Sequence, residues 1–361
     1  METGTSTENL REKVKALALA VGFDLAGVAV AEPTPETRFL REWLARGYSG
    51  TMEYMARRVE ERVDPRRVLE GARSVIAVGL VYAEKDGTGG APDVRVPGTA
   101  RVARYAGGDD YHEVMGDRLR TLVWGIEALA GRAVSSRHYV DTGPVQERVF
   151  AARGGLGWIG KNTCLIHPEL GSYLFLGVVL TDLEIAPDES EPDHCGNCRL
   201  CLDACPTDAL VAPYELDARR CIAHATIEDP GSIPPGQRED HGEWLFGCDI
   251  CQEVCPWNRT AGAALVDPLG LRERLRTRDA WQGPTLQWVL ELGPDAWQEV
   301  TRRSALRRAR HRGLLRNALV VAGNSGDRQL IPLVRKHAEG ADSLLREHAR
   351  WALERLEAVG A

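Results

Sequence analysis

Eight of the nine cysteines in this chain lie between residues 195 and 255, and this clustering constrains the fold more than any other feature. The N-terminal segment has no apolar core of the kind that directs export, and the longest apolar runs are too short to span a membrane. We therefore expect a soluble, cytoplasmic protein whose thiols stay reduced. Clustered cysteines in that compartment indicate metal binding or catalysis rather than disulfides.

The spacing of these cysteines is typical of a ferredoxin that binds two clusters. One run is C-x2-C-x2-C-x3-C-P from Cys195, and the other is C-x2-C-x3-C-P from Cys248, with Cys221 as a detached early ligand. In bacterial ferredoxins with two 4Fe–4S clusters, the cysteine before the proline binds the opposite cluster. The predicted ligands are therefore Cys195, Cys198, Cys201 and Cys255 for one cluster, and Cys205, Cys221, Cys248 and Cys251 for the other.

Structural zinc is the alternative for these cysteines. Zinc sites usually pair two C-x2-C units, and a triple run with two C-P ends fits that pattern poorly. The ninth cysteine, Cys164, is left over, and we predict a buried, inert thiol.

Residues 1–185 alternate between helical and strand-like patterns, which predicts an α/β (or α+β) domain. Helices are expected over 8–20, 36–46, 52–62, 110–130 and 144–153, and strands over 23–30, 74–82, 134–140 and 173–181. Residues 84–99 form a Gly- and Pro-rich loop.

The rest of the chain divides into two further regions. Residues 186–260 lose regular periodicity, as expected where metal clusters replace part of an apolar core, so they form a ferredoxin-like module with two clusters. Residues 261–361 are helical, and LRNALVVAG at 315–323 recurs weakly as LREHARWAL at 345–353. This recurrence suggests helix pairs of the HEAT type at the all-α C-terminus.

Several further segments can be read together with the cysteine runs. In chain order they are ERVDP at 61–65, ARYA at 103–106 running into DYH at 110–112, VDTGP at 140–144, and GWIGKN at 157–162. With the eight cysteines, they resemble the epoxyqueuosine reductases, cobalamin-dependent enzymes of the last step of queuosine synthesis on tRNA. The resemblance covers about residues 5–355.

This resemblance implies a base-off cobalamin held between the α/β domain and the ferredoxin-like module, with the two 4Fe–4S clusters feeding it electrons. The implied substrate is epoxyqueuosine at the wobble position of a tRNA anticodon, reduced to queuosine with loss of the epoxide oxygen as water. An electron donor of flavodoxin or ferredoxin type is expected. Because the sequence has no coiled-coil pattern, we expect a monomer.

The resemblance also assigns roles to individual residues. Asp141 matches the family's proton donor, and Arg62 matches an arginine that contacts cobalamin; a solvated helix-end arginine is the alternative for Arg62. Positions that line the corrin, in part through their backbone, match Ala103, Asp141, Thr163–Leu165 (Leu165 included), Leu176, Ala223, Asp249 and Ile250. Some family members carry Cys in place of Ala103 and Ser in place of Ala223, so contact through those two side chains is not implied.

The chemistry supports an acid at Asp141. Reductive opening of an epoxide leaves a basic, alkoxide-like oxygen that a positioned acid must protonate. A carboxyl group does this at neutral pH only if burial or a nearby negative charge raises its pKa. Asp141 also follows a strand, at the end where open α/β sheets bind ligands. The alternative is that Asp141 caps the helix over 144–153. Tyr111 and His112 could also face the corrin, or they could be structural residues of the helix over 110–130.

A tRNA substrate requires a basic surface, although the net charge of the chain is −7. Residues 301–316 contain seven arginines and no acidic residue. We expect these uncompensated arginines to contact phosphates, the alternative being a solvated helix face. The predicted tRNA contacts are Arg302, Arg303, Arg307, Arg308, Arg310 and Arg312.

Two other functions remain open from the sequence. A related corrinoid iron–sulfur reductase could act on a small molecule, as reductive dehalogenases do, but the missing export signal and the arginine run oppose this. A non-catalytic electron carrier would leave the α/β domain unexplained.

Overall fold

The computed structural model describes residues 6–82, 98–259 and 265–358. The loop predicted over 84–99 lies almost entirely outside the described residues. Within them, no helix has both the length and the apolar character needed to cross a membrane. The strands are β1 Leu25–Val30, β2 Ser74–Val81, β3 Arg101–Val102, β4 Ser136–Tyr139, β5 Trp158–Ile159, β6 Leu165–Ile166, β7 Leu174–Thr181, β8 Leu210–Ala212, β9 Glu215–Leu216 and β10 Trp244–Phe246.

The helices run the whole length of the described chain. In order they are α1 Thr7–Ala20, α2 Glu36–Ala45, α3 Glu53–Ala56, α4 Val59–Val63, α5 Tyr111–Ala130, α6 Glu147–Arg153, α7 Leu200–Asp203, α8 Ile222–Ile227, α9 Pro235–Arg238, α10 Ile250–Glu253, α11 Pro256–Arg259, α12 Leu271–Leu275, α13 Leu286–Glu291, α14 Pro294–Val300, α15 Arg310–Ser325, α16 Ile331–Ala338 and α17 Ser343–Ala358.

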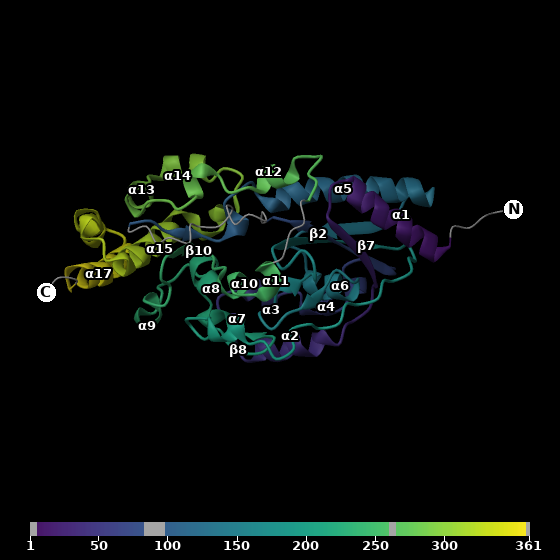
Figure 1. Ribbon diagram of the computed structural model, residues 1–361, viewed down its shortest axis with the longest axis horizontal. Coiled ribbons are helices and arrows are strands. Elements are labelled where there is room, and N and C mark those ends of the chain that lie inside the picture. The colour runs from purple at the N-terminus through teal and green to yellow at the C-terminus, as the bar shows by residue number, and fades with distance from the viewer. Residues whose placement is uncertain (1–5, 83–97, 260–264, 359–361) are drawn as a thin grey trace.

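A four-stranded sheet in the order β1-β2-β7-β4 forms the centre of the N-terminal half (Figure 1). Alternate residues of the buried strand β2 face opposite sides of this sheet. Ile76, Val78 and Leu80 join a core with α1 and α5, whereas Val75 and Ala77 join a second core with α6. The four strands and the helices predicted over 8–20, 36–46, 110–130 and 144–153 are confirmed, each within a few residues.

The direction of the strands corrects one expectation. Every neighbouring pair in the sheet is antiparallel, so the rule that ligands bind at the carboxyl ends of parallel strands does not apply to Asp141. The position of Asp141 is set instead by the turn that follows β4.

The helix predicted over 52–62 is also wrong, because the structure divides it into α3 and α4. Arg58 lies between them with a φ of +56°, in the left-handed region that ends a right-handed helix. Within this broken segment, Arg62 Nη2 donates to the carbonyl oxygen of Tyr54 at 3.4 Å.

The C-terminal helices form a separate core at the opposite end of the molecule from α1 (Figure 1). The central helix α15 is almost entirely buried, and α13, α16 and α17 pack against it or against each other. Two contacts cross the expected domain limits. Strand β3 pairs with β10 and joins the C-terminal core, while α12 places Leu271 and Leu275 in the core beneath α1 and α5.

Candidate active site and cluster-binding cysteines

The thiols predicted for the first cluster lie around one cavity. Cys195 and Cys198 precede the short helix α7, Cys201 lies within it, and Cys255 lies between α10 and α11. All four line the same cavity, together with Asn162, Ile166 and Trp257 among others. The Lys161 ammonium group donates to the carbonyl oxygens of Gly196 at 2.5 Å and Cys198 at 2.9 Å, which fixes the loop that carries the first two thiols. Cys255 thus joins the first run although it belongs to the second run in sequence.

The thiols predicted for the second cluster also lie near one another. Burial raises the pKa of Cys248, and the nearby thiols of Cys221 and Cys205 raise it further. Cys251 is likewise close enough to Cys248 and Cys221 for their charges to affect its pKa. The four thiols, from three separate segments, are therefore each close enough to at least two of the others for their charges to interact.

The ninth cysteine was predicted to be buried and inert, and its surroundings differ from that prediction. Cys164 is only half-buried, and its thiol forms a hydrogen bond with the thiol of Cys251. Five thiols therefore lie around the predicted site of the second cluster, whereas the cysteine spacing assigns four ligands to it.

Asp141 occupies a tight turn after β4. Its φ is +59°, and the Thr142 N–H donates to the Val140 carbonyl oxygen at 2.6 Å, which closes a γ-turn around it. Its own N–H donates to Glu147 Oε1 at 2.7 Å. The side chain is 65% exposed, so a ligand can reach the carboxylate. The helix-cap alternative is wrong, because α6 begins after Gln146 and no side chain caps it.

The Asp141 carboxylate ends a short chain of ionisable groups. His112 Nε2 lies 3.4 Å from Asp141 Oδ2, and His112 Nδ1 lies 2.7 Å from Asp110 Oδ1. The His112 ring stacks on Tyr111, with 4.1 Å between the ring centroids. Burial opposes the charged imidazolium, but the hydrogen bonds to both carboxylates outweigh it and raise the pKa of His112 to about 9. At neutral pH His112 therefore carries a proton next to Asp141.

This arrangement corrects the expected pKa of Asp141. Partial desolvation by the surrounding protein raises the pKa of this carboxyl, but the hydrogen bond and the charge of His112 outweigh desolvation, helped by Tyr111 and Arg148. The net effect lowers the pKa of Asp141 instead of raising it. The carboxyl with a raised pKa is Glu147, which burial and the charge of Asp141 shift to about 8.

Sequence reasoning left His112 between two roles and missed Glu147. The DYH segment was the available signal for His112, because it shares the chain's resemblance with the VDTGP segment. Glu147 carried no such signal, since its contact with Asp141 depends on how the turn after β4 meets α6.

The residues predicted to line a corrin fall into two linked groups. Leu165 and Leu176 belong to the core beneath β2, whereas Ala103 and Ile250 pack with Ile222 beside Cys248. Ala223 follows directly in α8 and is half-buried. A contact between the Cys164 and Cys251 thiols links the two groups. Cys164 precedes Leu165 of the first group, and Cys251 follows Ile250 of the second.

Three of these positions can reach a ligand only through their backbone. Ala103 and Asp249 are 2% exposed and Leu165 is 3% exposed, so their side chains are already enclosed by protein. The Asp249 carboxylate accepts the Arg104 N–H at 2.8 Å. Arg62 is half-buried rather than solvated, and its Nη1 donates to the Gly143 carbonyl oxygen at 3.4 Å beside Asp141.

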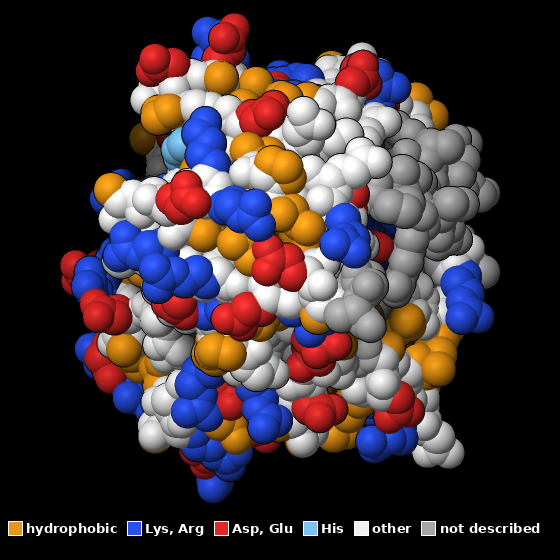
Figure 2. All heavy atoms as spheres, turned by 90° about the vertical axis from the view of Figure 1, so that its left-hand side faces the viewer, with side chains coloured by type: hydrophobic (Ala, Val, Ile, Leu, Met, Phe, Trp, Pro, Cys, Tyr) orange, Lys and Arg blue, Asp and Glu red, His pale blue; other side chains and the backbone are white. Residues whose placement is uncertain are grey.

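The expectation that the arginines of 301–316 are all uncompensated is wrong. Acidic residues distant in sequence pair with three of them, and Arg316 is fully buried. The pairs are Arg303 with Glu113, Arg308 with Glu228, and Arg312 with Asp342. Among the described residues, Arg302, Arg307 and Arg310 are exposed and have no side-chain ion pair. Basic and acidic side chains are likewise intermixed on the C-terminal end of the molecule (Figure 2).

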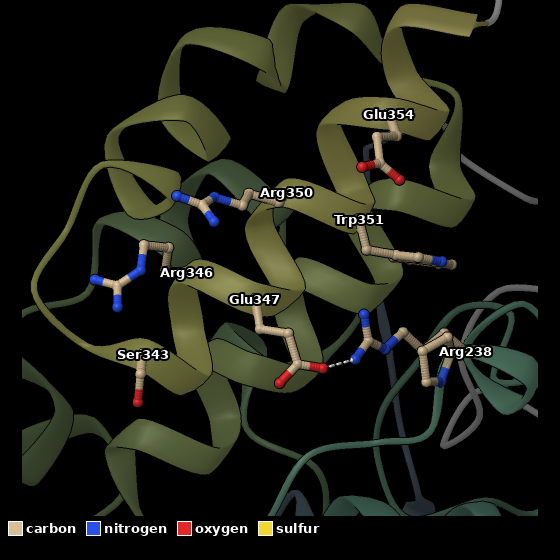
Figure 3. Close-up of a pocket in the computed structure, with 8 residues that line it drawn as sticks. Arg238, Ser343, Arg346, Glu347, Arg350, Trp351 and Glu354 are labelled. Carbon is tan, nitrogen blue, oxygen red and sulfur yellow. Dashed lines mark hydrogen bonds and ion pairs between the residues drawn. The ribbon is translucent and has the colours of Figure 1, made fainter.

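A hollow of about 400 Å³ lies between α9 and α17, on the outside of the C-terminal helices (Figure 3). Arg238 lies beside it, paired with Glu347 and placed over the ring of Trp351. None of the predicted site residues lines this hollow, so we assign it no part in catalysis.

Two family models match this chain. The model described as a 4Fe-4S double cluster binding domain matches residues 194–258, and the model described as Epoxyqueuosine reductase QueG, DUF1730 matches residues 62–142. The epoxyqueuosine reductase of Xanthomonas campestris pv. campestris is 40% identical over 347 residues, which cover 94% of each chain. This chain belongs to the epoxyqueuosine reductase family.

Solved structures of epoxyqueuosine reductases agree with this assignment. One, with an epoxyqueuosine-modified tRNA-Tyr stem loop, is 29% identical over 96% of this chain and 90% of its own, with a TM-score of 0.86. Another, from Bacillus subtilis, has its catalytic aspartate loop swung out of the active site; it is 29% identical, covers 96% and 90% of the two chains, and has a TM-score of 0.85. This epoxyqueuosine reductase is therefore an oxidoreductase with a domain for two 4Fe–4S clusters.

Proposed function

We propose that this epoxyqueuosine reductase reduces epoxyqueuosine at the wobble position of tRNA anticodons to queuosine. The observation that carries the proposal is the Asp110–His112–Asp141 chain in a protein that also gathers two sets of four cysteines. The reaction breaks both carbon–oxygen bonds of the epoxide and forms a carbon–carbon double bond. It consumes two electrons and two protons, and the oxygen leaves as water.

The residues present fit a base-off cobalamin between the sheet and the cysteine segment. The Nε–H of Arg62 is buried and has no acceptor among the described residues, which suits an amide oxygen of the corrin periphery. Arg62, Leu176 and Ile250 would hold the group through side chains, and Ala223 through its backbone. Ala103, Leu165 and Asp249 would do so through backbone atoms. Bound there, cobalamin supplies the strongly reducing cobalt centre that the cleavage of a carbon–oxygen bond requires.

The cysteine ligands also fit two 4Fe–4S clusters. We assign one to Cys195, Cys198, Cys201 and Cys255, and the other to Cys205, Cys221, Cys248 and Cys251. The indole N–H of Trp158 supports the first site, because it is buried next to Cys195 and Cys255 and has no acceptor in the described part of the chain. Clusters held by these cysteines would supply single-electron transfer from a donor of flavodoxin or ferredoxin type.

The protons that the reaction consumes come through the Asp110–His112–Asp141 chain. His112 stores a proton at neutral pH, because the carboxylates on either side of it stabilise the imidazolium. Asp141 takes this proton and delivers it to the oxygen that leaves the epoxide, and His112 is then recharged from solvent. In the B. subtilis relative the catalytic aspartate lies on a movable loop, and we assign the same role to the turn at 140–144.

The remaining assignments complete the proposal. We take residues 1–185 as the cobalamin-binding domain, 186–260 as the cluster module and 261–361 as a HEAT-like region. Support for the last comes from the packing of α15, α16 and α17. The enzyme acts in the cytoplasm as a monomer.

The direct test is turnover. Anaerobically purified protein with both clusters and cobalamin, given a chemical reductant, should convert epoxyqueuosine in tRNA to queuosine, measured by mass spectrometry of the digested nucleosides. An aryl halide is the matched control, because a dehalogenase-like enzyme would reduce it instead. Fully loaded protein that leaves epoxyqueuosine unchanged would show that the proposed substrate is wrong.

The tRNA backbone is bound by those arginines of 301–316 that have no acidic partner within the described ranges. Arg308 connects this stretch to the active site, since its guanidinium lies over the Tyr54 ring at 5.5 Å and its charge interacts with Asp141. Arg307 and Arg310 flank it and are exposed. They are placed to contact phosphates while the modified base enters the site.

Reversing the charge at both Arg307 and Arg310 tests this placement. The double glutamate variant should bind tRNA at least tenfold more weakly, and the slope of log affinity against log salt should fall by about two for two lost phosphate contacts. Titration of tRNA at several salt concentrations measures both. Arg132→Glu, just beyond the C-terminal end of α5, is the control and should bind as the wild type does. An unchanged slope in the double variant would place the tRNA elsewhere.

A further inference from the structure

The turn that presents Asp141 is strained. A γ-turn with a positive φ at its centre is rare, and a residue other than glycine pays for that conformation in free energy. Such a turn persists only where its surroundings hold it in place. The next residue but one, Gly143, lies so close to Tyr139 that an added Cβ atom would be 2.3 Å from the ring.

The contact that holds the turn comes from α6. Glu147 is the first residue of this helix, and its Oε1 accepts the Asp141 N–H at 2.7 Å. The helix is itself anchored, because Phe150 and Ala151 are buried in one core with residues of the sheet. A side chain on a fixed helix therefore defines where the Asp141 backbone lies.

We propose that Glu147 is a positioning residue that fastens the strained turn and so holds Asp141 toward His112. The proposal rests on the role given to Asp141 in the proposed function. Glu147 does not touch the substrate. It acts through one hydrogen bond, which its side chain accepts from the backbone N–H of Asp141.

The electrostatics of the site indicate that this bond does not need a charged acceptor. The ionisable groups that act on Glu147 include Asp141, His112 and Arg148, and its own charge acts on Arg62 and Tyr111. Burial and the charge of Asp141 favour the neutral carboxyl at pH 7. A neutral carboxyl still accepts an N–H through its carbonyl oxygen. Glutamine, which offers the same oxygen at the same distance, should therefore replace glutamate, whereas alanine and the shorter aspartate should not.

Hydrogen exchange of the intact protein, with its clusters and without substrate, tests the contact itself. In Glu147→Ala and Glu147→Asp, the amide of Asp141 should exchange at least about tenfold faster than in the wild type, read on peptides spanning 138–146 by mass spectrometry. In Glu147→Gln its exchange should stay near the wild-type rate. Equal exchange in all four proteins would overturn the proposal.

Turnover separates positioning from general damage to the fold. The Ala and Asp variants should lose at least about tenfold in kcat, with unchanged iron content and tRNA affinity, while the Gln variant stays within about threefold of the wild type. A Gln variant as impaired as the Ala variant would also overturn the proposal. If the Ala variant does not fold, the comparison of Asp with Gln decides. Because the exchange experiment uses no substrate, its result stands apart from whether epoxyqueuosine is the compound reduced.

Discussion

Replacing Asp141 by asparagine is expected to lower the turnover of epoxyqueuosine in tRNA by about 100-fold to 10,000-fold, the usual contribution of a positioned acid. Asparagine has nearly the same shape and cannot pass a proton from His112 to the epoxide oxygen. It also tolerates a positive φ as aspartate does, so the turn after β4 should survive. Single-turnover assays on loaded enzyme measure the loss.

The asparagine variant carries its own controls. Its iron content, cobalamin binding and tRNA affinity should equal those of the wild type, which would assign the loss to proton transfer. Turnover close to the wild-type rate would remove Asp141 from the role of acid.

The same proton path predicts a pH dependence. The pKa of His112 is about 9, because its two carboxylate partners outweigh the opposing effect of burial. The imidazolium is present below this pH and is lost above it, so turnover should fall as the pH rises through about 9. His112→Gln should lower turnover and abolish this fall.

Replacing Cys255 by alanine is expected to remove one of the two clusters and with it nearly all turnover. Cys255 lines the same cavity as Cys195, Cys198 and Cys201, so the first cluster loses a ligand when a residue of the second run is changed. Iron and sulfide should each fall from about eight to about four atoms per chain.

Comparison of single variants tests the crossed pairing of the ligands. Cys195→Ala and Cys255→Ala should lose the same cluster and give the same electron paramagnetic resonance spectrum, whereas Cys205→Ala should lose the other. Different spectra for the first two would mean that each run binds its own cluster. Cys164→Ser is the matched control, because its thiol contacts Cys251 but lies outside the predicted ligand set. It should retain both clusters.

The arginine stretch illustrates what one segment of sequence cannot reveal. Seven arginines without a local acid indicated one basic face. The structure divides them, because Glu113, Glu228 and Asp342 arrive from other parts of the chain to pair with three of them. Charge compensation depends on which residues are neighbours in space. As far as the described residues show, Arg302, Arg307 and Arg310 alone in this stretch remain exposed and without an acidic partner.

The sequence by itself determined the features that depend on short-range spacing. The intervals between cysteines set the double-cluster domain, and hydrophobic periodicity set the strands of the sheet and most helices before α6, because both act over a few residues. The tertiary structure alone decided the features that join distant segments. It made the sheet antiparallel, placed His112 and Glu147 on either side of Asp141, and lowered the pKa of that carboxyl. Hydrogen bonds and charges at 3 Å to 4 Å act between whatever residues the fold brings together, and sequence order does not fix those neighbours.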